Sequence, residues 1–153
     1  MLSNKVLRFL FMTIGVIGLF LTYFFQDYLN IYEGLLGTGH WKMPYTGTDY
    51  LDKGHEKAFV FNKILRYLLN DLFSISLIHG FFLNKSYTKM AFALMGIGLF
   101  FLLPIYLYLY LSALPGLSSL LSHLHRLILN PVLMMLLIPA LYYQNKLSDK
   151  KSE

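Results

Sequence analysis

The 153-residue sequence contains no cysteine and a single tryptophan, and only 14% of its residues are charged. The absence of cysteine excludes a disulfide framework, a thiolate metal site and a cysteine nucleophile. Charged residues make up about a quarter of an ordinary soluble domain, so their scarcity argues against a soluble protein. This chain therefore cannot carry out chemistry that depends on a thiolate.

The sequence is rich in apolar residues, which make up 56% of it and include 13 phenylalanines and 12 tyrosines. Apolar runs cover about residues 6–25, 58–83, 90–112 and 120–143. Each run is close to the ~20 residues that cross the hydrocarbon core of a bilayer. The first run follows basic residues, as in a signal peptide, but it is long and lacks a small-residue cleavage site, so we expect it to be retained.

The four runs predict helices, because backbone groups in lipid must be bonded within their own segment and the runs are too uniformly apolar for barrel strands. The expected fold is an all-α membrane protein, a four-transmembrane-helix bundle that forms one integral membrane domain over residues 1–153. Pro104 and Pro139 lie inside the third and fourth runs and are expected to bend them.

Basic residues predict the orientation of the bundle. They cluster at the N-terminus, between the second and third runs and after the fourth run: Lys5, Arg8, Lys85, Lys89, Lys146, Lys150 and Lys151. The positive-inside rule then places both termini in the cytoplasm. Residues 26–57 become an extracytoplasmic loop of roughly 30 residues, either irregular or resting on the membrane through Trp41. Residues 144–153 become a cytoplasmic tail.

The second run, "FNKILRYLLNDLFSISLIHG" at residues 61–80, carries polar groups where lipid-facing residues are expected. At helical spacing Lys63, Arg66, Asn70 and Ser74 share one arc, with Asp71 at its edge. An ionised side chain near the bilayer centre costs at least ~2.5 kcal/mol, so this arc should face protein or water. Two interpretations remain open: groups that lock helices together, or a pocket for a ligand or partner.

The stretch "HLHRLILNP", residues 123–131, supplies the matching polar groups in the fourth run. Arg126 lies at a depth similar to that of Asp71, and we expect the two to pair. Asn130 follows one turn later, and Asn130–Pro131 should break or kink the helix. The candidate partner- or ligand-contact residues are therefore Lys63, Arg66, Asn70, Asp71, Ser74, Arg126 and Asn130.

No catalytic or metal site is predicted. His123 and His125 are weak metal candidates, because rings two residues apart on a helix point in different directions and no Glu-x-x-His pattern accompanies them. Ser76 and His79 lack a third member and an oxyanion hole. We expect a protein without cofactor or enzymatic activity; an interfacial enzyme using His123, His125 or Asp71 is the weaker alternative.

Three stretches carry a resemblance to a known family: "LTYFFQDYLN", "ILRYLLNDLFSISLI" and "HRLILNPVLMMLLIPALYYQNK". The second contains an R-Y-x-x-N-x-x-x-S pattern at Arg66, Tyr67, Asn70 and Ser74, and the third contains N-P and P-A-x-Y-Y elements. In these features the chain resembles the small exosortase F system-associated membrane proteins of bacteria. The outer loop with Trp41 is longer than the family pattern.

The resemblance implies a protein of the bacterial cytoplasmic (inner) membrane that accompanies an exosortase, a polytopic cysteine transpeptidase-like enzyme that processes C-terminal sorting signals. The expected function is a non-enzymatic accessory subunit whose partners are membrane lipids and that enzyme. The alternative is a small membrane protein whose outward-facing polar cavity binds a lipid or another anionic ligand. The net charge is +5, but the basic residues flank the apolar runs, where they fix topology. No nucleic-acid partner is therefore expected.

Overall fold

The computed structural model describes residues 4–25, 31–32, 54–112, 116, 118–130 and 132–151. The elements in these ranges are helices: α1 (Asn4–Phe24), α3 (Glu56–Phe82), α4 (Lys85–Ile97), the π-helical turn η1 (Gly98–Leu102), α5 (Leu103–Leu111), α6 (Ser118–Leu129) and α7 (Val132–Lys151). Most of the predicted loop 26–57, including Trp41, lies outside the described residues, as does Pro131.

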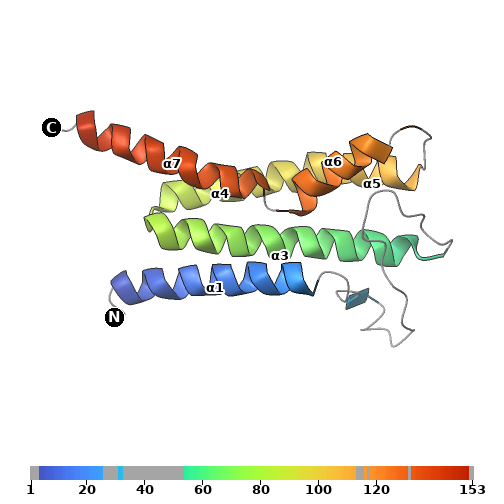
Figure 1. The fold of residues 1–153 in the computed structure, drawn as a ribbon, viewed down its shortest axis with the longest axis horizontal. Helices are drawn as coiled ribbons and strands as arrows, with labels where there is room; N and C mark the ends of the chain where they lie inside the picture. The colour runs from blue at the N-terminus through green and yellow to red at the C-terminus, as the bar shows by residue number, and fades with distance from the viewer. Residues whose placement is uncertain are drawn as a thin grey trace.

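Helix α3 lies in the middle of the molecule, with α1 on one side and α4, α5, α6 and α7 on the other (Figure 1). Helix α1 packs against α3, whereas α3 also contacts each of the elements on its far side. The two chain ends lie at the same end of the bundle as the turn between α3 and α4 (Figure 1). Helix α3 is therefore the element on which the other helices assemble.

The helices have the length and apolar character of membrane spans. Helix α1 and the continuous segment Lys85–Leu111 could each cross a membrane, and α6 with α7, bent by 55°, would form a third span if they cross together. The predicted all-α fold with membrane-spanning helices is thus confirmed at this coarser level. Helix α3, although 27 residues long, is outside this group because its charged residues lower its hydropathy.

The third apolar run contains a π turn immediately before Pro104. The Leu103 N–H bonds to the Gly98 carbonyl five residues back, and Pro104 lies at the start of α5. Proline has no N–H and clashes with the carbonyl four residues before it in an α-helix. Widening the turn accommodates the ring. Pro104, which was expected to bend the helix, is therefore accommodated by a π turn, and the segment Lys85–Leu111 remains continuous.

The fourth apolar run is broken where Asn130 precedes Pro131. Helix α6 ends at Leu129, and α7 begins at Val132. The Val132 N–H bonds to the Asn130 carbonyl at 2.7 Å, two residues back, instead of the carbonyl four residues back that an α-helix requires. The predicted break is confirmed, and Pro139 lies inside α7.

Glycines allow α1 and α3 to approach closely. Gly15 and Gly18 are both buried on the face of α1 that meets α3. A Cβ atom at Gly15 would lie 2.5 Å from Leu77 Cγ and 2.8 Å from the Phe73 carbonyl oxygen. The two glycines therefore bring backbone of α3 against backbone of α1.

A two-residue turn joins α3 to α4. Leu83 adopts a left-handed conformation (φ 48°) and donates its N–H to the His79 carbonyl at 2.8 Å. The Asn84 side chain accepts from the Ser86 N–H at 2.8 Å, which caps α4. His79 Nδ1 lies 2.8 Å from the Thr88 hydroxyl. These local contacts make α3 and α4 antiparallel neighbours.

Candidate functional site

Helix α3 buries a continuous row of polar side chains toward the rest of the bundle. Each is at most 5% exposed, and together we call them the polar arc: Asn62, Lys63, Arg66, Tyr67, Asn70, Asp71 and Ser74. These positions recur at intervals of three to four residues and so share one side of the helix. The residues that the sequence assigned to this arc, which was expected to face protein or water, are all buried within the described part of the protein.

Asn70 is the residue of the polar arc that joins three helices. Its Oδ1 accepts a hydrogen bond from the Thr22 hydroxyl of α1 at 2.6 Å, and its Nδ2 donates to the Leu129 carbonyl at 2.6 Å. Leu129 is the last residue of α6, so its carbonyl has no donor within that helix. Asn70 thus satisfies a carbonyl that the α6–α7 break leaves open.

Tyr67 reaches the backbone of the third apolar run. Its hydroxyl donates to the Met95 carbonyl at 2.9 Å, one turn before η1, where the α-helical hydrogen-bond pattern changes. Gly98 makes this approach possible, because a Cβ atom there would clash with the Tyr67 hydroxyl.

We expect Gly98→Ala to destabilise the protein by about 2 kcal/mol, because the added methyl displaces the Tyr67 hydroxyl and costs its buried hydrogen bond to the Met95 carbonyl. Denaturation in detergent, followed by circular dichroism, measures the change. Gly96→Ala is the matched control, since a Cβ atom there has no neighbour within 4 Å, and better helix propensity should make it neutral or stabilising. Equal destabilisation by both variants would contradict the role assigned to Gly98.

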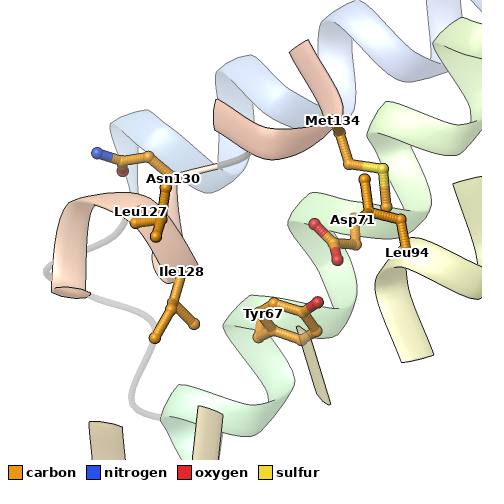
Figure 2. Close-up of a pocket in the computed structure, with 7 residues that line it drawn as sticks. All are labelled: Tyr67, Asp71, Leu94, Leu127, Ile128, Asn130 and Met134. Atoms are coloured by element: carbon orange, nitrogen blue, oxygen red, sulfur yellow. The ribbon is translucent and has the colours of Figure 1, made fainter. Parts of the chain in front are cut away.

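Asp71 faces a small cavity at the break between α6 and α7 (Figure 2). The cavity has a volume of about 10 Å³ and is lined by Tyr67, Asp71, Leu94, Leu127, Ile128, Asn130 and Met134. A volume of ~10 to 15 Å³ holds one water molecule. The cavity is therefore too small for an organic ligand or a lipid headgroup.

The expected ion pair between Asp71 and Arg126 is not formed. Asp71 is 5% exposed in the interior, whereas Arg126 is exposed and lines a separate groove. The buried face of α6 carries His125, Ile128 and Leu129. Arg126 is ~100° from His125 around the helix, and this rotation turns it away from α3.

Lys63 and Arg66 lie on the part of α3 that faces the aromatic side chains of α5. Lys63 Nζ is 5.1 Å from the centroid of the Phe59 ring, which stacks on Tyr110 at 4.3 Å. A cation over an aromatic face is attracted by the ring quadrupole, most strongly where water is excluded. Arg66 is 3% exposed in the same interior. Both cations are held inside the bundle and are not presented at its surface.

The remaining predicted residues make separate contacts and do not form one site. The Ser74 hydroxyl donates to the Asn70 carbonyl of its own helix at 2.8 Å. The Asn130 amide points away from Asp71 (Figure 2). His123 is exposed, whereas His125 is 8% exposed and hydrogen-bonded through Nδ1 to the Tyr106 hydroxyl at 2.9 Å. The described residues contain no group of three or more His, Cys, Asp or Glu that could hold a metal.

Ser76 and His79 bind different neighbours. The Ser76 hydroxyl donates to the Phe11 carbonyl of α1 at 2.9 Å. His79 hydrogen-bonds Thr88 of α4 and meets the Phe11 ring edge-on at 4.8 Å between centroids. The two side chains thus act as separate contacts between helices, not as a catalytic pair.

Sequence reasoning missed Thr22, Asn62 and the contacts of Tyr67. Thr22 is a polar residue in an apolar run, and it lies one turn after Gly18 on the face that packs against α3, which is a usable signal. Asn62 precedes Lys63 and accepts a hydrogen bond from the Tyr32 N–H at 3.2 Å. No sequence signal pointed to that contact, because its donor is a backbone group.

The polar arc is thus a set of interhelical hydrogen bonds and cation–aromatic contacts with room for about one water molecule. Such an arrangement fixes the positions of α1, α4 and α6 around α3. No family model matches the chain, and no curated protein or solved structure gave a match.

Proposed function

We propose that this chain is a non-enzymatic accessory subunit of a bacterial membrane protein-sorting system, bound in the inner membrane to a larger polytopic enzyme of exosortase type. The observation that carries the proposal is the closed interior of the described bundle, whose cavity beside Asp71 is about 10 Å³. A protein without an internal site of substrate size acts through its surface. The R-Y-x-x-N-x-x-x-S resemblance supplies the kind of partner.

The proposal includes four membrane spans, with α3 as the second and α6 with α7 as the fourth. Both chain ends and the α3–α4 turn lie at one end of the bundle (Figure 1), as an even number of spans requires. The elements that start or finish there carry the basic residues Lys5, Arg8, Lys85, Lys89 and Lys146. The positive-inside rule makes this end cytoplasmic.

A partner has a large apolar surface available on α1. This helix packs on α3, and its outer side exposes Phe20 at 62% and Phe24 at 65%, with ring centroids 5.7 Å apart. On the opposite side of the bundle η1 exposes Phe100 at 74% and Phe101 at 65%. The two phenylalanine pairs therefore lie on two different faces of the bundle, and each face contacts either lipid or a partner.

Affinity purification from native membranes in mild detergent tests the accessory function. We expect the wild-type chain to bring down a polytopic cysteine enzyme, identified by mass spectrometry, and one of the two phenylalanine pairs to be required. The double variants Phe20→Ala/Phe24→Ala and Phe100→Ala/Phe101→Ala delete similar amounts of exposed aromatic surface on the two faces, so each is the control for the other. Loss of about 1 kcal/mol or more per docked ring lowers recovery at least fivefold.

The accessory function fails if the wild-type chain, at matched expression, is purified without a polytopic partner. It also fails if both double variants recover the enzyme as well as the wild type does, because the partner then binds neither face.

The alternative function, a lipid-binding cavity built from Arg66, Asp71 and Arg126, finds no support in the interior. Arg66 and Asp71 are buried, the cavity beside Asp71 is of water size, and Arg126 lies in another groove. Lipid recognition, if it occurs, needs a different site.

A further inference from the structure

Helix α6 has a polar side that the bundle does not use. Its buried side carries Leu121, His125, Ile128 and Leu129. Its other side lines a groove of about 270 Å³ formed by Ser118, Ser119, Ser122, His123 and Arg126. This groove, which we call the α6 groove, is about 27 times larger than the cavity beside Asp71, taking the ratio of 270 to 10 Å³. It has room for several non-hydrogen atoms of a ligand.

The chemistry of the α6 groove favours an anion. Its described lining contains a guanidinium, an imidazole and three hydroxyls, and no carboxylate. His123 Nδ1 lies 2.7 Å from the Ser119 carbonyl, which can only accept, so Nδ1 donates to it and Nε2 of the neutral ring is left as an acceptor for a hydroxyl of a ligand. The Arg126 guanidinium forms no hydrogen bond or ion pair with the part of the chain that the structure describes. Its planar fork of donors matches phosphate oxygens.

The depth of Arg126 adds a second, independent reason. Arg126 is eight residues after Ser118, about 12 Å along α6 from its outer end. In the four-span arrangement this places the Arg126 backbone well inside the outer half of the bilayer. A cation at that depth is costly unless it finds a counter-charge or reaches water. Because helical side chains lean toward the N-terminus, Arg126 extends outward over the turn that holds Ser122 and His123.

The position of the groove favours a lipid over a free anion. Leu120, next to Ser119 on α6, is 47% exposed. It offers apolar surface for an acyl chain beside the polar groups. A phosphate that enters from the outer leaflet meets the donors at the outer end of α6 while its lipid tails stay beside this helix.

We infer that the α6 groove binds the phosphate of an anionic phospholipid from the outer leaflet, with Arg126 as its counter-charge and the serine hydroxyls as further donors. This site is separate from the polar arc. It rests on the four-span arrangement included in the proposed function, but not on the partner enzyme. A lipid held there coats the outer end of α6 and satisfies the one arginine of this helix.

Native mass spectrometry of the purified chain, reconstituted with equal amounts of phosphatidylglycerol and an uncharged glycolipid, tests the inference. We expect the wild type to retain phosphatidylglycerol and Arg126→Gln to retain about tenfold less, since a charge-assisted contact to phosphate is lost. Arg126→Lys should keep an intermediate amount, because it preserves charge without the fork. Lys89→Gln is the control: Lys89 is exposed at the other end of the bundle, and the charge change is the same.

Two results would overturn the inference. Equal retention of phosphatidylglycerol by wild type and Arg126→Gln would remove Arg126 from the site. Full displacement of the lipid by millimolar inorganic phosphate would make the groove a site for free anions. Circular dichroism of each variant, unchanged from the wild type, keeps loss of lipid distinct from loss of fold. The experiment uses the chain without its partner, so failure of the accessory function leaves its outcome readable.

Discussion

Replacing Gly15 by leucine is expected to separate α1 from α3 and to destabilise the protein by about 3 kcal/mol. The reason is the backbone: a Cβ atom at Gly15 would lie 2.8 Å from the Phe73 carbonyl oxygen and 3.0 Å from the Leu77 nitrogen. Side chains can change rotamer, but these two atoms belong to the backbone of α3 and cannot shift unless the helix itself moves. Relief therefore requires the two helices to move apart along their whole shared seam.

Separation of the helices can be measured by cross-linking. The chain has no cysteine, so Phe11→Cys and Ser76→Cys create a unique thiol pair at a place where the Ser76 hydroxyl now reaches the Phe11 carbonyl at 2.9 Å. A short bismaleimide should link this pair efficiently in the wild-type background. Gly15→Leu should lower the yield at least tenfold, as expected for a separation that favours the open state by more than ~1.4 kcal/mol.

The control is Val16→Leu, one residue along α1, because Val16 is 57% exposed and its added methylene points away from α3. This variant should cross-link as the wild type does. If Gly15→Leu also cross-links fully and remains as stable as the wild type, α1 does not pack on α3 through its glycines.

Removing the amide of Asn70 is the second change with a large expected effect. Asn70→Ala withdraws the donor from the Leu129 carbonyl at 2.6 Å and the acceptor from the Thr22 hydroxyl at 2.6 Å. Thr22 keeps alternative acceptors, since the Gly18 and Leu19 carbonyls each lie 3.1 Å away. The Leu129 carbonyl, at the end of α6, loses its hydrogen bond from the Asn70 amide. An unsatisfied buried carbonyl costs about 1 to 3 kcal/mol, so a loss of about 2 kcal/mol is expected.

A titration with a denaturing detergent, read by circular dichroism, gives the free energy of unfolding for each variant. Asn130→Ala is the matched control, because the Asn130 amide points away from Asp71 (Figure 2) and its loss should change stability by less than ~0.5 kcal/mol. Asn70→Asp separates the two roles of the amide, since a carboxyl still accepts from Thr22 but an ionised one repels the Leu129 carbonyl. Asn70→Asp as stable as the wild type would show that the contact to Leu129 is unimportant.

The apolar runs made the helices predictable. The first three runs match helical segments within five residues at either end, because a bilayer leaves the backbone few other choices. The fourth run begins close to the start of α6, but α7 continues to Lys151, into residues predicted as a tail. The direction of the polar arc was also predictable, since the periodicity of Lys63, Arg66, Asn70 and Ser74 assigns them to one side of the helix before any neighbour is known.

The partners of the polar arc were not predictable from depth alone. Asp71 and Arg126 lie at comparable depths, but an ion pair also needs the two helices to turn these residues toward each other. The amphipathic pattern of α6 carried that information: its buried residues include His125 and Leu129, and Arg126 is ~100° away from His125. Backbone partners such as the Leu129 and Met95 carbonyls depend on the break and the π turn, so they leave no side-chain signal.

The central position of α3 bears on how the protein enters the membrane. In the four-span arrangement, α3 carries Lys63, Arg66 and Asp71 into the bilayer, although it lacks the apolar character found in α1 and in Lys85–Leu111. Such a helix partitions poorly by itself during synthesis. The turn at Leu83 and Asn84 joins it directly to the very apolar segment that follows. Helix α3 should therefore insert together with that segment as a helical hairpin. Helix α1, inserted before them, then packs against the other side of α3.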